Sequence, residues 1–163
     1  MTEHQQQAQN QTENDEYLCI IQINLNKSEK AHLDIINKKV STNYDIMLIQ
    51  EPYTTTFNTI HSPANFRPIF PINKIQNKEQ IQLVIWVNKR LDTKNWMILK
   101  ILGSNNLTAL QIQGQYGKIL ILNIYNNCSH SRNEIILKRF IQEHTNLIIN
   151  NENHHMIWAG NFN

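Results

Sequence analysis

Residues 44–50 read YDIMLIQ, a run that is apolar at almost every position, and Glu51 and Pro52 follow it directly. Continuous apolar runs of this length are typical of strands that are buried on both faces, whereas half-exposed strands alternate apolar with polar residues. Pro52 ends the run because proline has no N–H to donate to a neighbouring strand. The stretch therefore predicts a buried central strand with a carboxylate, Glu51, at its carboxyl end.

The residues before this strand predict a second strand and a helix. YLCIIQIN (17–24) is a β-branched and apolar run of strand length, and Ser28 is a suitable helix N-cap. Apolar side chains then recur at helical spacing, at Ala31, Leu33, Ile36 and Val40. Residues 1–16 contain almost no apolar side chain, so we expect a disordered tail there and one domain over residues 17–163.

The residues after the central strand predict five more strands beyond a turn-like stretch at 51–66. Several of the runs alternate apolar with polar residues, and short Asn-, Gly- and Lys-containing segments of the kind found in hairpins separate them. The runs are RPIFPI (67–72), QIQLVIWVN (80–88), NWMILKIL (95–102), LTALQIQG (107–114) and KILILNIYNN (118–127). They predict a mostly antiparallel meander in a single sheet.

A second helix and a last strand complete the pattern. Ser131 and Glu134 have the spacing of a capping box, and apolar side chains follow along one helical stripe within 131–151. HHMIWAG (154–160) then returns as a strand. The fold class is therefore α+β, with strands outnumbering helices and no internal repeat.

Composition excludes several functional classes. The 15 Lys and Arg residues nearly balance the 13 Asp and Glu residues, so no strong long-range field attracts nucleic acid or an anionic membrane. Cys19 and Cys128 lack the spacing of a zinc site or a disulfide framework, and no apolar run is long enough to span a membrane. We expect an intracellular protein, nuclear or cytoplasmic and not secreted, without a membrane partner.

Polar residues stand where four of the expected strands end. The groups are Asn24 and Asn26, then Glu51, then Tyr125 and Asn127, and finally Asn161 and Asn163. Mg²⁺ prefers oxygen ligands and is often held by one or two carboxylates together with water and substrate phosphate. The alternative for each Asn alone is a turn former that bonds its own backbone, and for Glu51 a solvated residue before a proline turn.

Five segments of the chain form a recognisable set of motifs: CIIQINLNKS (19–28), DIMLIQEPY (45–53), VNKRLDTKNW (87–96), ILNIYNN (121–127) and HHMIWAGNFN (154–163). In this order they resemble the endonuclease/exonuclease/phosphatase family. Within the family they are most similar to the apurinic-type endonuclease domain of fungal non-LTR (Tad-like) retrotransposons. The resemblance implies the N-terminal portion of a four-layer α/β sandwich, in which two mainly antiparallel sheets pack together between helices.

The resemblance also implies roles for individual residues. Glu51 and Asn24 would hold Mg²⁺, for which Mn²⁺ could substitute, while Tyr125, Asn161 and Asn163 would be catalytic. The neighbouring polar residues Asn26 and Asn127 are weaker candidates for contacts with the substrate phosphate. The implied reaction is hydrolysis of a phosphodiester in DNA. We therefore expect Asn24, Glu51, Tyr125 and Asn163 to converge at one end of the sheet.

Two departures from the family pattern predict impaired activity. Asn161 stands where the family has a water-activating Asp, and an amide cannot accept the proton; positioned acid–base groups contribute about 10²–10⁴ in rate. The family's late SDH-like segment, which carries a catalytic Asp and His, has no counterpart in these 163 residues. We interpret residues 17–163 as a truncated domain that is inactive or very weakly active.

Truncation would leave essentially one sheet with an exposed apolar inner face, through which the chain could self-associate. One alternative function is therefore a non-catalytic DNA-binding or oligomerising remnant of such a domain. Another alternative is an enzyme of the same superfamily that acts on phosphoinositide or sphingolipid phosphoesters.

Overall fold

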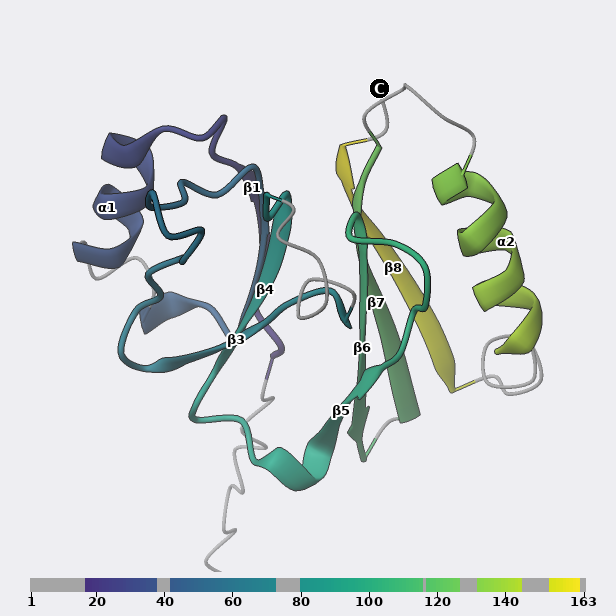
Figure 1. Ribbon diagram of the computed structural model, residues 1–163. Coiled ribbons are helices and arrows are strands. Elements are labelled where there is room, and N and C mark those ends of the chain that lie inside the picture. Colours follow the sequence, from purple (N-terminus) through teal and green to yellow (C-terminus); the bar gives the residue numbers. More distant parts are fainter. Residues whose placement is uncertain are drawn as a thin grey trace, which may run out of the picture.

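The computed structural model describes residues 17–37, 42–72, 80–115, 117–126, 132–144 and 153–161. Residues 1–16 lie outside these ranges, so the disordered tail stays a prediction. Within the described ranges the strands form two mixed sheets of four strands each (Figure 1).

The first sheet has the strand order β1-β2-β4-β3. Its strands are β1 (Ile20–Asn24), β2 (Ile46–Gln50), β4 (Leu83–Asn88) and β3 (Phe66–Ile69). β1 pairs with β2 in parallel, and β4 pairs with both β2 and β3 in antiparallel orientation. All five residues of β2 are buried, which confirms the buried central strand expected from YDIMLIQ.

The second sheet has the strand order β5-β6-β7-β8. Its strands are β5 (Trp96–Leu99), β6 (Leu107–Gly114), β7 (Gly117–Tyr125) and β8 (His154–Asn161). The first three form an antiparallel meander, and β8 joins β7 in parallel. The parallel pairing needs a crossover between the two strands, and the chain forms α2 (Arg132–Glu143) within that crossover.

Three hydrophobic clusters show that the elements stack in four layers. The first cluster lies between the two sheets, where Ile46 and Leu48 of β2 share a core with Leu110 of β6 and Ile121 of β7. A second cluster packs the other face of the first sheet against α1 (Glu29–Asn37), and a third packs the second sheet against α2. Neighbouring residues of β2 contribute to different clusters because successive side chains in a strand point to opposite faces.

The expectation of a single sheet with an exposed inner face is therefore wrong. The inner faces of the two sheets cover each other, and the chain changes sheets between β4 and β5. A short 3₁₀ helix (Thr93–Asn95) lies in this connection, and its N-cap Asp92 accepts a hydrogen bond from the Lys94 N–H at 3.0 Å. In sequence such a short polar segment looks the same whether it closes a hairpin or crosses between sheets.

The ends of the two helices agree with the sequence signals where they are described. The Ser28 hydroxyl accepts a hydrogen bond from the Ala31 N–H at 3.2 Å, as an N-cap does, and α1 begins at Glu29. α2 begins at Arg132, whereas Ser131 of the expected capping box lies outside the described residues.

Candidate active site

Polar residues from both sheets meet at one end of the sandwich. Asn24 is the last residue of β1 and stands in register with Gln50, the last residue of β2. Tyr125 ends β7 in register with Asn161, which ends β8. These four strands run in the same direction, so their carboxyl ends lie together at the top of Figure 1. The site is therefore composed of residues from two sheets, not one.

Glu51 has a strained backbone that is fixed on both sides. Its φ of 45° lies in the left-handed region, which costs an L-residue other than glycine about 1–2 kcal/mol. The Glu51 N–H donates to the Gln82 carbonyl and the Glu51 carbonyl accepts from the Lys27 N–H, both at 2.8 Å. Neighbouring segments thus hold the residue in a conformation that projects its carboxylate beyond the end of β2.

Asn24 contacts the Glu51 carboxylate directly. Its Nδ2 donates to Oε1 of Glu51 at 3.2 Å, and its Oδ1 accepts from the Asn26 N–H at 2.8 Å. The second bond is the turn-forming interaction expected of a lone Asn, and the first orients Glu51. One side chain therefore serves both the turn and the site. Asn26 itself is exposed in the turn, at a φ of 47°.

Tyr125 reaches Glu51 from the other sheet. Burial of the phenol raises the pKa of Tyr125 above its usual value near 10, and the negative charge of Glu51 and a hydrogen bond to its carboxylate raise it further. The phenol therefore stays protonated at neutral pH and keeps an O–H that it can donate.

Asn161 lies beside Tyr125 in the register of the second sheet. Its backbone carbonyl accepts a hydrogen bond from the Asn126 N–H at 2.9 Å, which extends the pairing by one residue. Asn127 and Asn163 lie outside the described residues, so the placement of these two expected site residues stays a prediction.

Two buried carboxamides below the site were missed by sequence reasoning. Gln50 and Asn123 are completely buried, and their side chains are hydrogen-bonded to each other across the two sheets. Both interrupt otherwise apolar strand sequences, IMLIQ and ILILNIY, and stand within two residues of Glu51 and Tyr125. A polar side chain in a doubly buried strand was the available signal.

The donor set around Glu51 suits a hard divalent cation whose coordination shell is completed by water and substrate. Within the part of the chain that the structure describes, no three His, Cys, Asp or Glu residues are grouped as a metal site. One carboxylate with nearby amide and phenol oxygens is a donor set that a hard divalent cation such as Mg²⁺ accepts, since such an ion keeps several waters when few protein ligands bind it.

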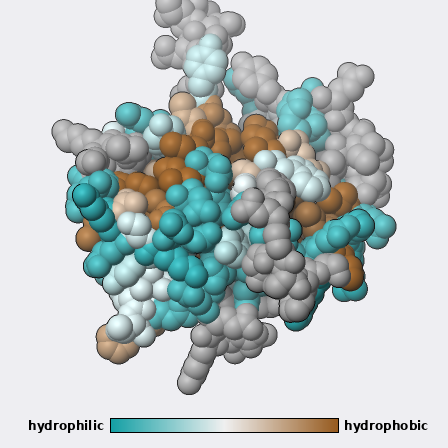
Figure 2. All heavy atoms as spheres, turned by 90° about the horizontal axis from the view of Figure 1, so that it is seen from above, coloured by the Kyte–Doolittle hydropathy of each residue, from teal (hydrophilic) through white to brown (hydrophobic). Residues whose placement is uncertain are grey.

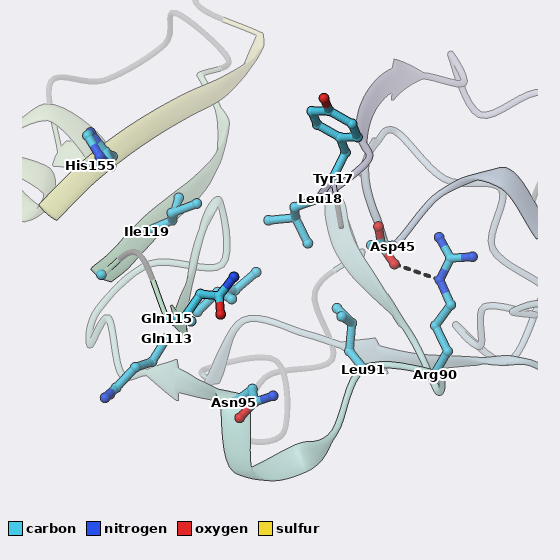
Figure 3. A pocket seen from close by; sticks show the side chains of 13 residues that line it. Tyr17, Leu18, Asp45, Arg90, Leu91, Asn95, Gln113, Gln115, Ile119 and His155 are labelled. Carbon is cyan, nitrogen blue, oxygen red and sulfur yellow. Dashed lines mark hydrogen bonds and ion pairs between the residues drawn. The ribbon is translucent and has the colours of Figure 1, made fainter. Parts of the chain in front are cut away.

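The cavity shown in Figure 3 lies at the opposite end of the same strands. Its volume is about 840 Å³, and it is lined by residues that precede β1 and β2, such as Leu18 and Asp45, and by Ile119 and His155 near the start of β7 and β8. Arg90, which belongs to the VNKRLDTKNW motif, forms an ion pair with Asp45 at 2.6 Å at this end of the strands. Of the expected site residues that the structure describes, none lines this cavity.

Comparison with known proteins supports the fold. Neither a protein-family model nor a curated protein matches the sequence. Among solved structures, the chain is similar to the endonuclease domain of TRAS1, a telomere-specific non-LTR retrotransposon, with 18% identity and a TM-score of 0.62. It is also similar to a humanized D. rerio TDP2 carrying 14 mutations, with 14% identity and a TM-score of 0.50.

Both similarities cover 88% of this chain, which spans 58% of the TRAS1 domain and 61% of the TDP2 structure. No helix in the described ranges is long and apolar enough to cross a membrane. The two packed sheets, the flanking helices and these similarities agree with the fold that the five sequence motifs predicted. This chain therefore shares its fold with the TRAS1 endonuclease domain and with TDP2 over most of its length.

Proposed function

We propose that the chain is a Mg²⁺-dependent DNA endonuclease domain of retrotransposon origin, and that Asn161 impairs it in this copy. The convergence of Asn24, Glu51 and Tyr125 from two sheets carries the proposal. The similarity to a retrotransposon endonuclease domain supports it, because that domain shares the fold on which this site is built. The motifs that resemble the family contain the same three residues.

Glu51 and Asn24 are the residues that would hold Mg²⁺ or Mn²⁺. When bound, the ion stabilises negative charge on the phosphoryl oxygens of the substrate. Glu51 contributes a full negative charge, and the hydrogen bond from Asn24 orients its carboxylate. Because the backbone of Glu51 is fixed by two hydrogen bonds, the carboxylate needs little reorganisation when a ligand arrives.

Tyr125, Asn161 and Asn163 would act on the scissile phosphate. Tyr125 keeps its proton at neutral pH and can donate a hydrogen bond to a phosphate oxygen. Asn161 can orient a water or a phosphate through its amide, but it has no carboxylate to accept a proton. We assign Asn163 to phosphate binding, with Asn26 and Asn127 as weaker contacts to the substrate.

The loss of this carboxylate favours one alternative, a non-catalytic module that binds DNA. Replacing a base by an amide removes proton acceptance and leaves hydrogen bonding to phosphate in place. Such a chain would bind DNA more readily than it cuts it. The phosphoinositide and sphingolipid alternatives gain no support from a contact in the described site.

A Mg²⁺ titration followed by NMR tests the metal site. We expect Mg²⁺ to shift the backbone amides of Asn24, Asn26 and Glu51, and Glu51→Gln to abolish those shifts while keeping the fold. Lys94→Gln is the matched control and should leave them intact, because Lys94 is exposed in the 3₁₀ helix next to Asn95, which lines the cavity at the opposite end of the sandwich. Unchanged amides at saturating Mg²⁺ would refute the metal assignment.

A plasmid-nicking assay separates the enzyme from the binding module. The 163-residue chain should nick supercoiled DNA in Mg²⁺ no faster than Glu51→Ala. Asn161→Asp alone should not restore cleavage, because these 163 residues also lack a counterpart of the family's SDH-like Asp and His, and catalytic groups that act as a unit are strongly non-additive. Glu51-dependent cleavage by the unchanged chain would overturn the proposed impairment. Mg²⁺-independent DNA binding that survives Glu51→Ala would favour the non-catalytic module.

Self-association, if it occurs, would use strand edges and not an inner sheet face. β1 and β8 each have a strand on one side only within the described residues, and Trp158 of β8 is 44% exposed. Figure 2 shows hydrophobic surface gathered into a band between hydrophilic flanks on the face seen from above. Open edges of this kind pair readily with another chain.

A further inference from the structure

A chain of three carboxamides connects the first sheet to the second just below the candidate site. The Gln22 side-chain amide donates to the Gln50 side-chain oxygen, and the Gln50 amide donates to Oδ1 of Asn123. Gln22 and Gln50 belong to β1 and β2, whereas Asn123 belongs to β7. The bond between Gln50 and Asn123 therefore crosses the interface between the two sheets.

The carboxamide of Asn123 is fully used. Its Nδ2 donates to the Ile49 carbonyl at 3.3 Å and to the Val84 carbonyl at 3.1 Å, so it ties β7 to two neighbouring strands of the opposite sheet. Oδ1 accepts from Gln50. Hydrogen bonds at both ends of the amide offset the desolvation cost of this completely buried side chain.

These hydrogen bonds depend on the relative position of the two sheets, whereas the apolar contacts between the sheets do not. The buried residues of the cluster between the sheets are aliphatic, for example Ile46, Leu110 and Ile121. Hydrophobic contact is non-directional, so two aliphatic faces tolerate small sliding movements. A hydrogen bond weakens steeply when its angle deviates, so the carboxamides favour one relative position of the sheets.

The carboxamide bridge lies immediately beneath the contact between Glu51 and Tyr125. Gln50 precedes Glu51 in the chain, and Asn123 shares a face of β7 with Tyr125 because only one residue stands between them. A shift of the sheets at this level would change the separation of the carboxylate and the phenol, which come from different sheets.

We propose that Gln50 and Asn123 are positioning residues that set the separation of Glu51 and Tyr125 across the two sheets. The proposal rests on the function proposed above, since this separation matters for a site shared by metal and phosphate. Neither residue touches the substrate. Each acts through the strand that carries a site residue.

The first test uses Asn123→Leu and Gln50→Met, which keep side-chain size and remove the bridge. Without Mg²⁺, the unchanged protein should show a nuclear Overhauser effect between the Tyr125 ring and the Glu51 side chain, and both variants should lose it. Ile121→Val is the matched control, since it trims the same sheet interface on the same strand and leaves the carboxamides intact. A retained cross-peak in Asn123→Leu would overturn the proposal.

A single substitution leaves a buried partner unsatisfied and could unfold the chain. The double variant Gln50→Met/Asn123→Leu removes both partners of the bridging bond, so it should fold better than either single variant while still losing the cross-peak. The unchanged protein gives a further check that needs no variant: the side-chain amide protons of Asn123 should exchange slowly with solvent. Exchange as fast as that of exposed Asn side chains would refute the bridge.

Mg²⁺ affinity distinguishes failure of this proposal from failure of the proposed function. Loss of groups that orient metal ligands weakens binding by about 10–100-fold, so the folded double variant should bind Mg²⁺ at least about tenfold more weakly than Ile121→Val. If the unchanged protein binds no Mg²⁺, the proposed metal site fails, and the metal-free cross-peak still tests the bridge. Equal affinity in the double variant and Ile121→Val would overturn the positioning role.

Discussion

Leu110→Ala tests whether the two sheets pack face to face. Leu110 is completely buried in the cluster between the sheets. Truncating the leucine side chain to alanine removes three methyl- or methylene-sized groups at about 0.8 kcal/mol each, or about 2.4 kcal/mol of transfer free energy. The cavity that remains adds to this cost, so we expect unfolding free energy to fall by about 3–4 kcal/mol. Because domains of this size are stable by only about 5–15 kcal/mol, the loss would be easily measured.

Urea denaturation followed by circular dichroism measures the change, with an unchanged slope showing that the transition is comparable. Met97→Ala in the edge strand β5 is the control, because Met97 is 52% exposed and its truncation should cost well under half as much. If the inner face were exposed, as a single-sheet arrangement requires, Leu110→Ala would cost no more than Met97→Ala. Equal costs for the two variants would therefore refute the four-layer packing.

Two further predictions concern the backbone, and a third concerns a buried histidine. A methyl group at Gly160 would lie 1.8 Å from the Ile124 carbonyl oxygen at a φ of +147°, so Gly160→Ala should separate β8 from β7 and lower the melting temperature. Glu51→Gly should be more stable than Glu51→Ala by about 1 kcal/mol in thermal melts, because only glycine relieves the left-handed backbone. Burial lowers the pKa of His32, so the unfolded chain binds its proton first and stability should fall as pH drops below about 6.5; His32→Phe should flatten that part of the stability profile.

The sequence predicts individual elements better than their assembly. YDIMLIQ predicts a doubly buried strand because burial on both faces excludes polar residues from almost every position. Ser28 predicts the start of α1 because an N-cap is a local interaction within three residues. The division into two sheets depends on whether the segment after Asn88 turns back or crosses over, and that choice is made by long-range packing between β2 and β7.

The candidate site could also be predicted only in part. Placement of Asn24, Glu51 and Tyr125 at strand ends follows from local patterns, and the parallel pairs bring those ends together. Contact between Glu51 and Tyr125 could not be predicted from strand order alone, because it requires two sheets to face each other at a particular offset. Gln50 and Asn123 lie in the two strands that must be aligned, so a hydrogen bond between their carboxamides can form only at one offset of the two sheets.

The backbone at Asn161 would be held in the same way whether its side chain ended in an amide or a carboxylate. Three backbone features hold this position: the register with Tyr125, the carbonyl that accepts from Asn126, and the close approach of Gly160 to β7. None of them depends on whether the side chain ends in a carboxylate or an amide. Asp and Asn have nearly the same shape, so exchanging them alters charge and proton acceptance while packing is retained. Asn161→Asp should therefore leave the melting temperature nearly unchanged, and an effect on cleavage is expected only if the proposed function holds.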